Sequence, residues 1–284
     1  MTTQADRDLY CLECSGFVIL PSFVAADALH NISRKGLEFE EEVARFVDAG
    51  GEAILRHSWP LRTTRCMYAI ASEVQELALD PTVQMFAQRY LGRAVLRDCL
   101  IQTNMPDDRN AKRGLGADLS FHRDTLWPSD SIHRMYLHAF VLLDDFTRQN
   151  GATVVVPGSH RLREPGYYFK LTDPRGPQSG IDYRVYERRY FPSAVPLEAP
   201  RGSLVLLDPM AIHTQGNNVT AKRRSLLNMT FRSAGVVGSP PLLNARAIAE
   251  RFARVPVRAE LLDLLESDQS LPAHFGPLGN PWPG

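Results

Sequence analysis

Apolar and polar positions along the chain predict helices first and short strands afterwards. Residues 16–21 form a brief apolar run that ends at a proline, which is typical of a short buried strand. Apolar residues then recur every three to four positions over residues 26–47, so an amphipathic helix is predicted there. Residues 72–79 predict a further helix. Asp80 and Pro81 open another one that ends near residue 91, because Asp caps helices well and Pro suits the first turn.

From residue 94 onward the pattern changes to short β-rich runs separated by Gly, Pro and Asn. The predicted strands are 95–103, 134–143, 152–156, 203–207, 212–214 and 225–231. Many short strands with turn residues between them favour a sandwich or barrel over a doubly wound sheet. Residues 105–118 and 164–180 interrupt the strands, and loops of that length in a compact domain usually carry function.

A single domain is predicted over residues 1–284, because the sequence shows no internal repeat and no compositional break typical of a linker. Its predicted parts are a short polar leader, a helical N-terminal part at about 24–92, a β core at about 94–232 and a helical tail at about 242–268. A chain of 284 residues lies at the upper end of what one hydrophobic core supports.

Charge and composition exclude several partner classes. Lys plus Arg and Asp plus Glu number 32 each, so the formal net charge of zero gives no reason to expect nucleic acid or an anionic membrane as a partner. The apolar runs are too short to cross a bilayer, and the polar N-terminus does not resemble a signal peptide. We therefore expect a cytoplasmic protein with four free cysteines, including the isolated Cys11-x-x-Cys14 pair.

A candidate metal site follows from three residues. His122 and Asp124 are two positions apart, so on a strand both would face one cation, and His213 follows the apolar run 203–207. Two imidazoles and one carboxylate on one face of iron(II) leave three positions open, for 2-oxoglutarate and dioxygen. Arg224, eleven residues after His213, would bind the far carboxylate of 2-oxoglutarate in bidentate fashion. Taken alone, His122-x-Asp124 also fits a surface pair and His213 a core histidine.

Four segments resemble the phytanoyl-CoA dioxygenase family of iron(II)/2-oxoglutarate oxygenases, and together they span most of residues 16–232. They are the opening at 16–23, His122-x-Asp124, the run at 150–160, and His213 with Arg224 eleven residues later. The resemblance implies a mainly β fold with flanking helices, built on a double-stranded β-helix (a cupin-like jelly roll) with the site inside the barrel mouth. It also implies His122, Asp124 and His213 as the catalytic iron ligands and Arg224 as the 2-oxoglutarate anchor.

The resemblance extends to three further polar positions. Gln102 and Asn104 match positions where the family places polar groups that face cosubstrate or substrate. Gln215 stands where the family often has a serine that assists the cosubstrate carboxylate, and its amide is still a donor. His133 and His138 are interpreted as strand residues with ordinary partners, with a pocket-facing His138 as the alternative, and His160 as a structural turn residue. Trp127, three residues after Asp124, fits a pocket wall and a core residue equally well.

The implied function is hydroxylation of an unactivated C–H bond in a small-molecule metabolite or natural-product intermediate, with release of succinate and carbon dioxide. Related halogenases have Gly or Ala in place of the carboxylate, so Asp124 favours hydroxylation. Desaturation, cyclisation, epoxidation and epimerisation by the same chemistry stay open. A cupin-like metal hydrolase or isomerase and a non-catalytic binding module are the remaining alternatives, and Arg224 argues against both. The expected partners are the substrate, 2-oxoglutarate and dioxygen.

Overall fold

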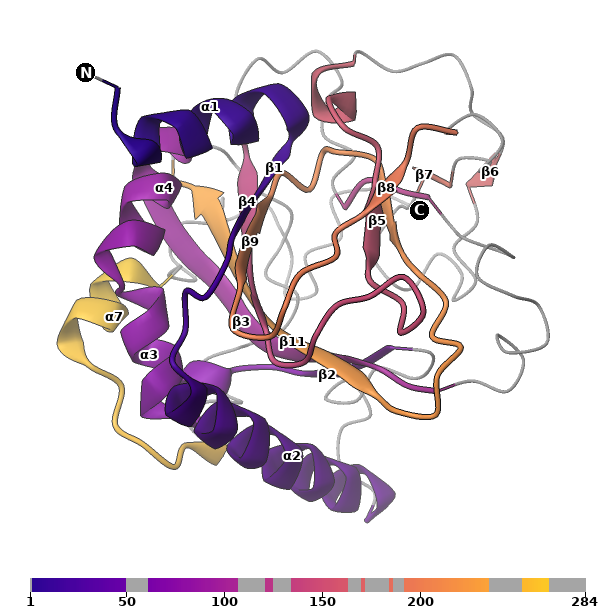
Figure 1. Cartoon of the computed structure of the whole chain (residues 1–284). Helices are drawn as coiled ribbons and strands as arrows, with labels where there is room; N and C mark the ends of the chain where they lie inside the picture. The colour runs from indigo at the N-terminus through magenta and orange to yellow at the C-terminus, as the bar shows by residue number, and fades with distance from the viewer. Residues whose placement is uncertain are drawn as a thin grey trace, which may run out of the picture.

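Two antiparallel sheets form the centre of the molecule, with helices on one side (Figure 1). The computed structural model describes residues 2–49, 61–106, 121–124, 134–162, 170–171, 184–185, 192–234 and 252–265. The larger sheet contains β1 Phe17–Leu20, β2 Leu61–Thr64, β3 Ala94–Asn104, β4 Tyr136–Leu142, β9 Leu204–Leu207 and β11 Arg224–Ser233. Its strand order is β1-β9-β4-β11-β3-β2. This order is not sequential, so the sheet is closed by long-range pairings rather than by local hairpins.

The smaller sheet faces the larger one. It consists of β5 Thr153–Val155, β8 Val195–Pro196 and β10 His213–Gln215, in the order β10-β5-β8. A separate pair joins β6 Lys170–Leu171 to β7 Arg184–Val185. The two facing sheets make the jelly-roll core, which confirms the predicted fold class.

The two faces of the larger sheet contact different parts of the molecule. Along β11, Leu227 and Met229 face one side and pack into the main hydrophobic core with the helices. Leu226 faces the other side and packs with Phe140 of β4 and with Val155 of the smaller sheet. Side chains alternate along a strand, so even-numbered residues from Arg224 to Thr230 of β11 point into the barrel.

The helices cover the outer face of the larger sheet (Figure 1). They are α1 Gln4–Ser15, α2 Ala26–Asp48, α3 Ser72–Ala78, α4 Pro81–Leu91 and α7 Ala259–Leu264. In α2, Leu29, Ile32 and Phe39 are buried on one stripe, as the apolar period predicted. The predicted bounds of α2, α3 and α4 and of the main strands agree with the structure within three residues.

Helix α1 and strand β2 were not predicted. The polar leader is largely α1, which begins with a capping box: Asp6 N donates to Thr3 Oγ1 at 3.1 Å and Thr3 N donates to Asp6 Oδ2 at 3.0 Å. Only two of its residues are buried, so its apolar pattern is weak. Of the predicted helical tail, residues 252–265 are described; residue 252 is helical and α7 follows, and the rest of the tail lies outside the described residues. Most of both predicted loops lies outside the described residues.

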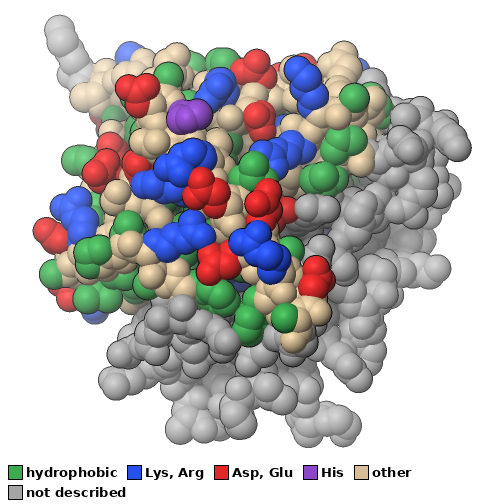
Figure 2. All heavy atoms as spheres, turned by 90° about the horizontal axis from the view of Figure 1, so that it is seen from below, with side chains coloured by type: hydrophobic (Ala, Val, Ile, Leu, Met, Phe, Trp, Pro, Cys, Tyr) green, Lys and Arg blue, Asp and Glu red, His purple; other side chains and the backbone are tan. Residues whose placement is uncertain are grey.

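The face on which α2 lies carries charges of both signs. Figure 2 shows blue and red side chains interleaved there, and the ion pairs Arg34–Glu38, Lys35–Glu73 and Arg254–Glu42 explain the mixing. The exposed pairs among them contribute little to stability, whereas Lys35 and Glu73 are half-buried. Within the described ranges, the structure contains no helix that is both long and apolar enough to span a bilayer.

The N-terminal cap of α4 gives a first prediction. Asp80 Oδ1 accepts hydrogen bonds from Thr82 N at 2.8 Å and Val83 N at 3.3 Å. Asp80→Ala should lower the free energy of unfolding by about 1 kcal/mol, whereas Asp80→Asn should retain most of it because an amide oxygen caps as well as a carboxylate. Denaturant unfolding measures both values, and equal losses in the two variants would contradict the capping role.

Candidate metal centre

A backbone bridge places His122 beside His213. His122 N donates to His213 O at 2.8 Å, and His213 N donates to His122 O at 2.9 Å. His213 is the first residue of β10 and pairs with Val155 of β5, so residues 121–122 extend the smaller sheet by one short edge. The ring centroids of the two histidines are 4.7 Å apart.

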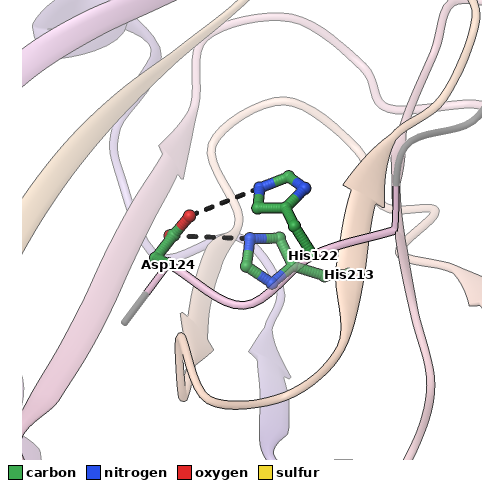
Figure 3. A group of neighbouring side chains, drawn as sticks. All are labelled: His122, Asp124 and His213. Atoms are coloured by element: carbon green, nitrogen blue, oxygen red, sulfur yellow. Dashed lines mark ion pairs between the residues drawn. The ribbon is translucent and has the colours of Figure 1, made fainter. Parts of the chain in front are cut away.

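Asp124 approaches both rings from a bend. Its backbone N donates to Pro209 O at 3.0 Å, which ties the bend to the segment just before His213. Asp124 Oδ1 lies 3.3 Å from His122 Nε2, and Oδ2 lies 3.5 Å from His213 Nε2 (Figure 3). One ligand atom from each of the three residues lies within 4.8 Å of the others.

The three predicted residues therefore converge, although not in the way the sequence indicated. A regular strand through His122 and Asp124 was expected, but only residues 121–122 pair and Asp124 lies in the bend. Phe121 packs with Val156 and Ile212 in a small buried cluster, which holds this edge against β5 and β10. The turn, and not strand alternation, directs the carboxylate toward the rings.

The protonation states of the centre depend on its members. Burial on its own would raise the pKa of the Asp124 carboxyl, but the charge of His213 and hydrogen bonds from three histidines hold that pKa well below its usual range. Burial would lower the pKa of His213, yet the neighbouring Asp124 charge outweighs it and raises the pKa. His213 Nδ1 lies 2.8 Å from Ala211 O and donates to it, so Nε2 is the nitrogen of the neutral ring that offers a lone pair.

The donor set suits a catalytic divalent metal. Two imidazole nitrogens and one carboxylate oxygen are the ligands that iron(II) takes in facial sites, and three protein ligands leave coordination positions open. The side chains of His122 and Asp124 are 24% and 31% exposed, whereas that of His213 is buried. The centre is thus open on the side of His122 and Asp124, where a small molecule can approach.

Arg224 is a fully buried cation on the inner face of β11. Its Nη2 donates to Gly151 O, and its guanidinium lies 4.2 Å from the centroid of the Phe146 ring. Nε and Nη1 have no hydrogen-bond partner among the described residues. Burial lowers the pKa of Arg224 to about 9, and the charge of Asp144 only partly offsets this. A buried guanidinium with two free donor nitrogens fits a carboxylate ligand.

The turn at residues 151–152, just before β5, contacts both Arg224 and the end of β10, the strand that carries His213. Gly216 N donates to Ala152 O at 3.1 Å, directly beside the Gly151 carbonyl that Arg224 binds. Gly151 has a φ of +80°, and a Cβ there would lie 2.5 Å from Gly216 O, so only glycine fits this junction. The turn at residues 151–152 therefore connects the arginine to the strand that carries His213.

The three other predicted residues lie around this junction. Asn104 pairs with Arg224 across β3 and β11, but its Nδ2 donates to Gly216 O at 3.1 Å, so the amide already serves the junction. Gln102 pairs with Leu226 and therefore lies on the inner face. Gln215, half-buried, lies two residues after His213 on β10 and shares its side of the strand.

His138 belongs to the site, as one of its two sequence interpretations allowed. Its Nε2 lies 2.7 Å from Asp124 Oδ2, so the ring faces the metal ligands. A histidine in the middle of an apolar strand is a signal, because a buried ring needs polar partners. For His160 the structural turn role agrees with the structure, since its Nε2 lies 3.0 Å from Glu13 O. Trp127 and His133 lie outside the described residues.

Comparisons with known proteins show the family and the fold of this chain. The family model of Phytanoyl-CoA dioxygenase (PhyH) matches residues 12–226. The human peroxisomal phytanoyl-CoA dioxygenase is 25% identical over 249 residues, which cover 82% of this chain and 69% of the human protein. Two solved structures share the fold. The 2-oxoglutarate-dependent carbocyclase SnoK from nogalamycin biosynthesis is 17% identical with a TM-score of 0.60, covering 92% of this chain and 98% of its own. HygX from Streptomyces hygroscopicus, with nickel and 2-oxoglutarate bound, is 16% identical with a TM-score of 0.55, covering 82% and 87%.

The raised pKa of His213 predicts how pH affects metal binding. In the metal-free protein Asp124 stabilises the protonated imidazole, so a proton competes with the metal for His213 Nε2. Affinity for Mn(II) should fall as the pH drops below the raised pKa, by up to about tenfold per pH unit for one released proton. Calorimetry in buffers of different ionisation enthalpy measures the proton release. Binding that releases no proton near neutral pH would contradict this assignment.

Proposed function

The chain belongs to the phytanoyl-CoA dioxygenase family, and on that basis we propose that it is an iron(II)- and 2-oxoglutarate-dependent oxygenase that hydroxylates a small molecule. The observation that supports this most directly is the combination of two sites in one barrel. His122, Asp124 and His213 converge as metal ligands, and a buried Arg224 offers unpaired donors for a carboxylate. Neither a metal hydrolase nor a non-catalytic binding module requires the buried arginine.

The proposal assigns a role to each metal ligand, to Arg224 and to Gln215. His122 Nε2, His213 Nε2 and one oxygen of Asp124 would hold the iron. With iron(II) and 2-oxoglutarate bound, this class of site activates dioxygen and releases succinate and carbon dioxide. Arg224 would bind the far carboxylate of 2-oxoglutarate through its unpaired guanidinium N–H groups, and Gln215 would add a hydrogen bond.

The surroundings exclude water from the anchor. Arg224 is stacked on Phe146, and Phe146 belongs to the inner apolar cluster with Phe140, Leu142 and Leu226. Ion pairs and charge-assisted hydrogen bonds strengthen when water is excluded. The guanidinium is thus already oriented before the cosubstrate binds. Binding of the cosubstrate carboxylate would then neutralise a charge whose burial is unfavourable.

The substrate is proposed to be a metabolite or natural-product intermediate that enters on the exposed side of His122 and Asp124. Hydroxylation is the preferred outcome because Asp124 retains the carboxylate ligand. Epimerisation and ring formation are the second candidate, since the fold is shared with an epimerase and a carbocyclase from nogalamycin biosynthesis. We also propose that the protein works in the cytoplasm, where its four free cysteines stay reduced.

An anaerobic titration tests the cosubstrate assignment. Iron(II) and 2-oxoglutarate added together should give a weak visible charge-transfer band that neither gives alone, because the band requires chelation of the metal by the cosubstrate. Asp124→Ala should lose the band or weaken it strongly. In folded wild-type protein, a flat visible spectrum would favour the hydrolase or binding alternatives.

Arg224 and its neighbour Arg223 form a matched pair, since Arg223 is exposed and Arg224 is fully buried. Arg224→Gln should raise the Kd for 2-oxoglutarate roughly 10- to 100-fold, because one or two charge-assisted hydrogen bonds are lost. The Kd of Arg224→Lys for 2-oxoglutarate should lie between those of wild type and Arg224→Gln, because lysine keeps the charge but cannot donate two parallel hydrogen bonds. The affinity for iron should stay within a few-fold of wild type in both. Arg223→Gln should change neither quantity; a collapse of iron affinity with unchanged cosubstrate dependence would refute the anchor role.

A further inference from the structure

We propose that His138 is a positioning residue that holds the Asp124 carboxylate so that a single oxygen is left for the metal. The inference rests on the proposed function, because it concerns the same centre. His138 would not bind the metal itself, but it would determine whether Asp124 binds the metal through one oxygen or two. The evidence is a chain of contacts that begins on β4 and ends at the Asp124 carboxylate.

His138 is fixed on every side. It lies in the middle of β4, all of whose residues are buried, and it is itself 7% exposed. Its Nδ1 lies 3.0 Å from Oγ1 of Thr230, the residue opposite it on β11. Its ring stacks on Phe140 with the centroids 5.4 Å apart and the planes 19° apart. The ring therefore cannot turn without losing a hydrogen bond and a packing contact.

The remaining nitrogen points at the carboxylate. His138 Nε2 lies 2.7 Å from Asp124 Oδ2, the shortest of the three distances between this carboxylate and a histidine ring. An ionised carboxylate only accepts hydrogen bonds, so the hydrogen must be on Nε2. Oδ2 is then engaged by a donor, while Oδ1, 3.3 Å from His122 Nε2, is the oxygen left for a metal held by the two ligand rings.

Coordination by one oxygen has a consequence for the cosubstrate. A carboxylate that binds through both oxygens takes two positions on a metal, whereas one oxygen takes a single position. In a six-coordinate facial site, three protein donors leave three positions, and 2-oxoglutarate with dioxygen needs all three. By occupying Oδ2, His138 would prevent Asp124 from competing for one of them. The affinity for 2-oxoglutarate is then the quantity most sensitive to His138.

The sequence of β4 supports a dedicated role. Its residues are Tyr, Leu, His, Ala, Phe, Val and Leu, so His138 is the one imidazole in an otherwise apolar or aromatic strand. A buried ring nitrogen needs a hydrogen-bond partner, because its desolvation is otherwise uncompensated. An apolar residue opposite Leu207 and Thr230 would avoid this cost, which indicates that the imidazole is kept for its contact with Asp124.

The test uses Co(II) and 2-oxoglutarate without dioxygen, so that it does not depend on turnover. His138→Phe keeps an aromatic ring for stacking and removes both nitrogens, whereas His138→Gln keeps an N–H donor. His160→Gln is the control, because His160 is a partly buried histidine whose partner is the Glu13 carbonyl. The visible spectrum of bound Co(II) reports coordination number, and titrations give the affinities for metal and 2-oxoglutarate.

For His138→Phe we expect an altered Co(II) spectrum and a Kd for 2-oxoglutarate raised about tenfold or more, with a smaller loss of metal affinity. His138→Gln should recover much of both, and His160→Gln should match wild type. If His138→Phe does not fold, Thr230→Val, which removes the Nδ1 partner and the longer hydrogen bond from Thr230 Oγ1 to Asn228 Oδ1, should give the same change to a smaller degree.

Three results would overturn the proposal. A wild-type spectrum and wild-type 2-oxoglutarate affinity in His138→Phe would remove the positioning role and leave the proposed function intact. Loss of metal in both His138 variants, as complete as in His213→Gln, would make His138 a ligand instead. Failure of the wild-type protein to bind Co(II) would contradict the metal centre itself, and with it the proposed function.

Discussion

The two backbone hydrogen bonds between His122 and His213 are the constraint on which the site depends. They join segments that are far apart in the sequence and extend the smaller sheet by one edge. These bonds place the two imidazoles side by side. The hydrogen bond from Asp124 N to Pro209 O then holds the Asp124 carboxylate next to both rings. The ligands are therefore placed by the main chain, which is stiffer than side-chain packing alone and suits a centre that must keep open positions.

A second constraint is the buried charge of Arg224. The same β11 strand that supplies apolar residues to the outer core carries this guanidinium on its inner face. Because side chains alternate along β11, its outward residues stabilise the fold while its inward residues are available to bind ligands. The positive φ of Gly151 lets its carbonyl approach the arginine, and its neighbour Ala152 binds Gly216 after β10. The anchor and the metal ligands consequently belong to one connected unit.

The sequence predicted much of this, for reasons that can be stated. Helices α2 and α4 carry strong apolar periods or a cap, and the core strands are apolar runs between turn residues, so local signals determined them. Helix α1 has few buried residues, and its cap was not recognised. The bend at Asp124 and the contact of His138 arise from long-range pairing, which no local pattern encodes. The roles of Gln102 and Gln215 stay predictions, whereas the amide of Asn104 serves the junction.

The most direct test is a crystal structure of the protein prepared without dioxygen in the presence of iron(II) and 2-oxoglutarate. The account predicts one iron bound by Nε2 of His122, one oxygen of Asp124 and Nε2 of His213. It also predicts the cosubstrate chelating that iron, with its far carboxylate on the guanidinium of Arg224. An iron held without one of these three residues, or a cosubstrate carboxylate that binds away from Arg224, would contradict it.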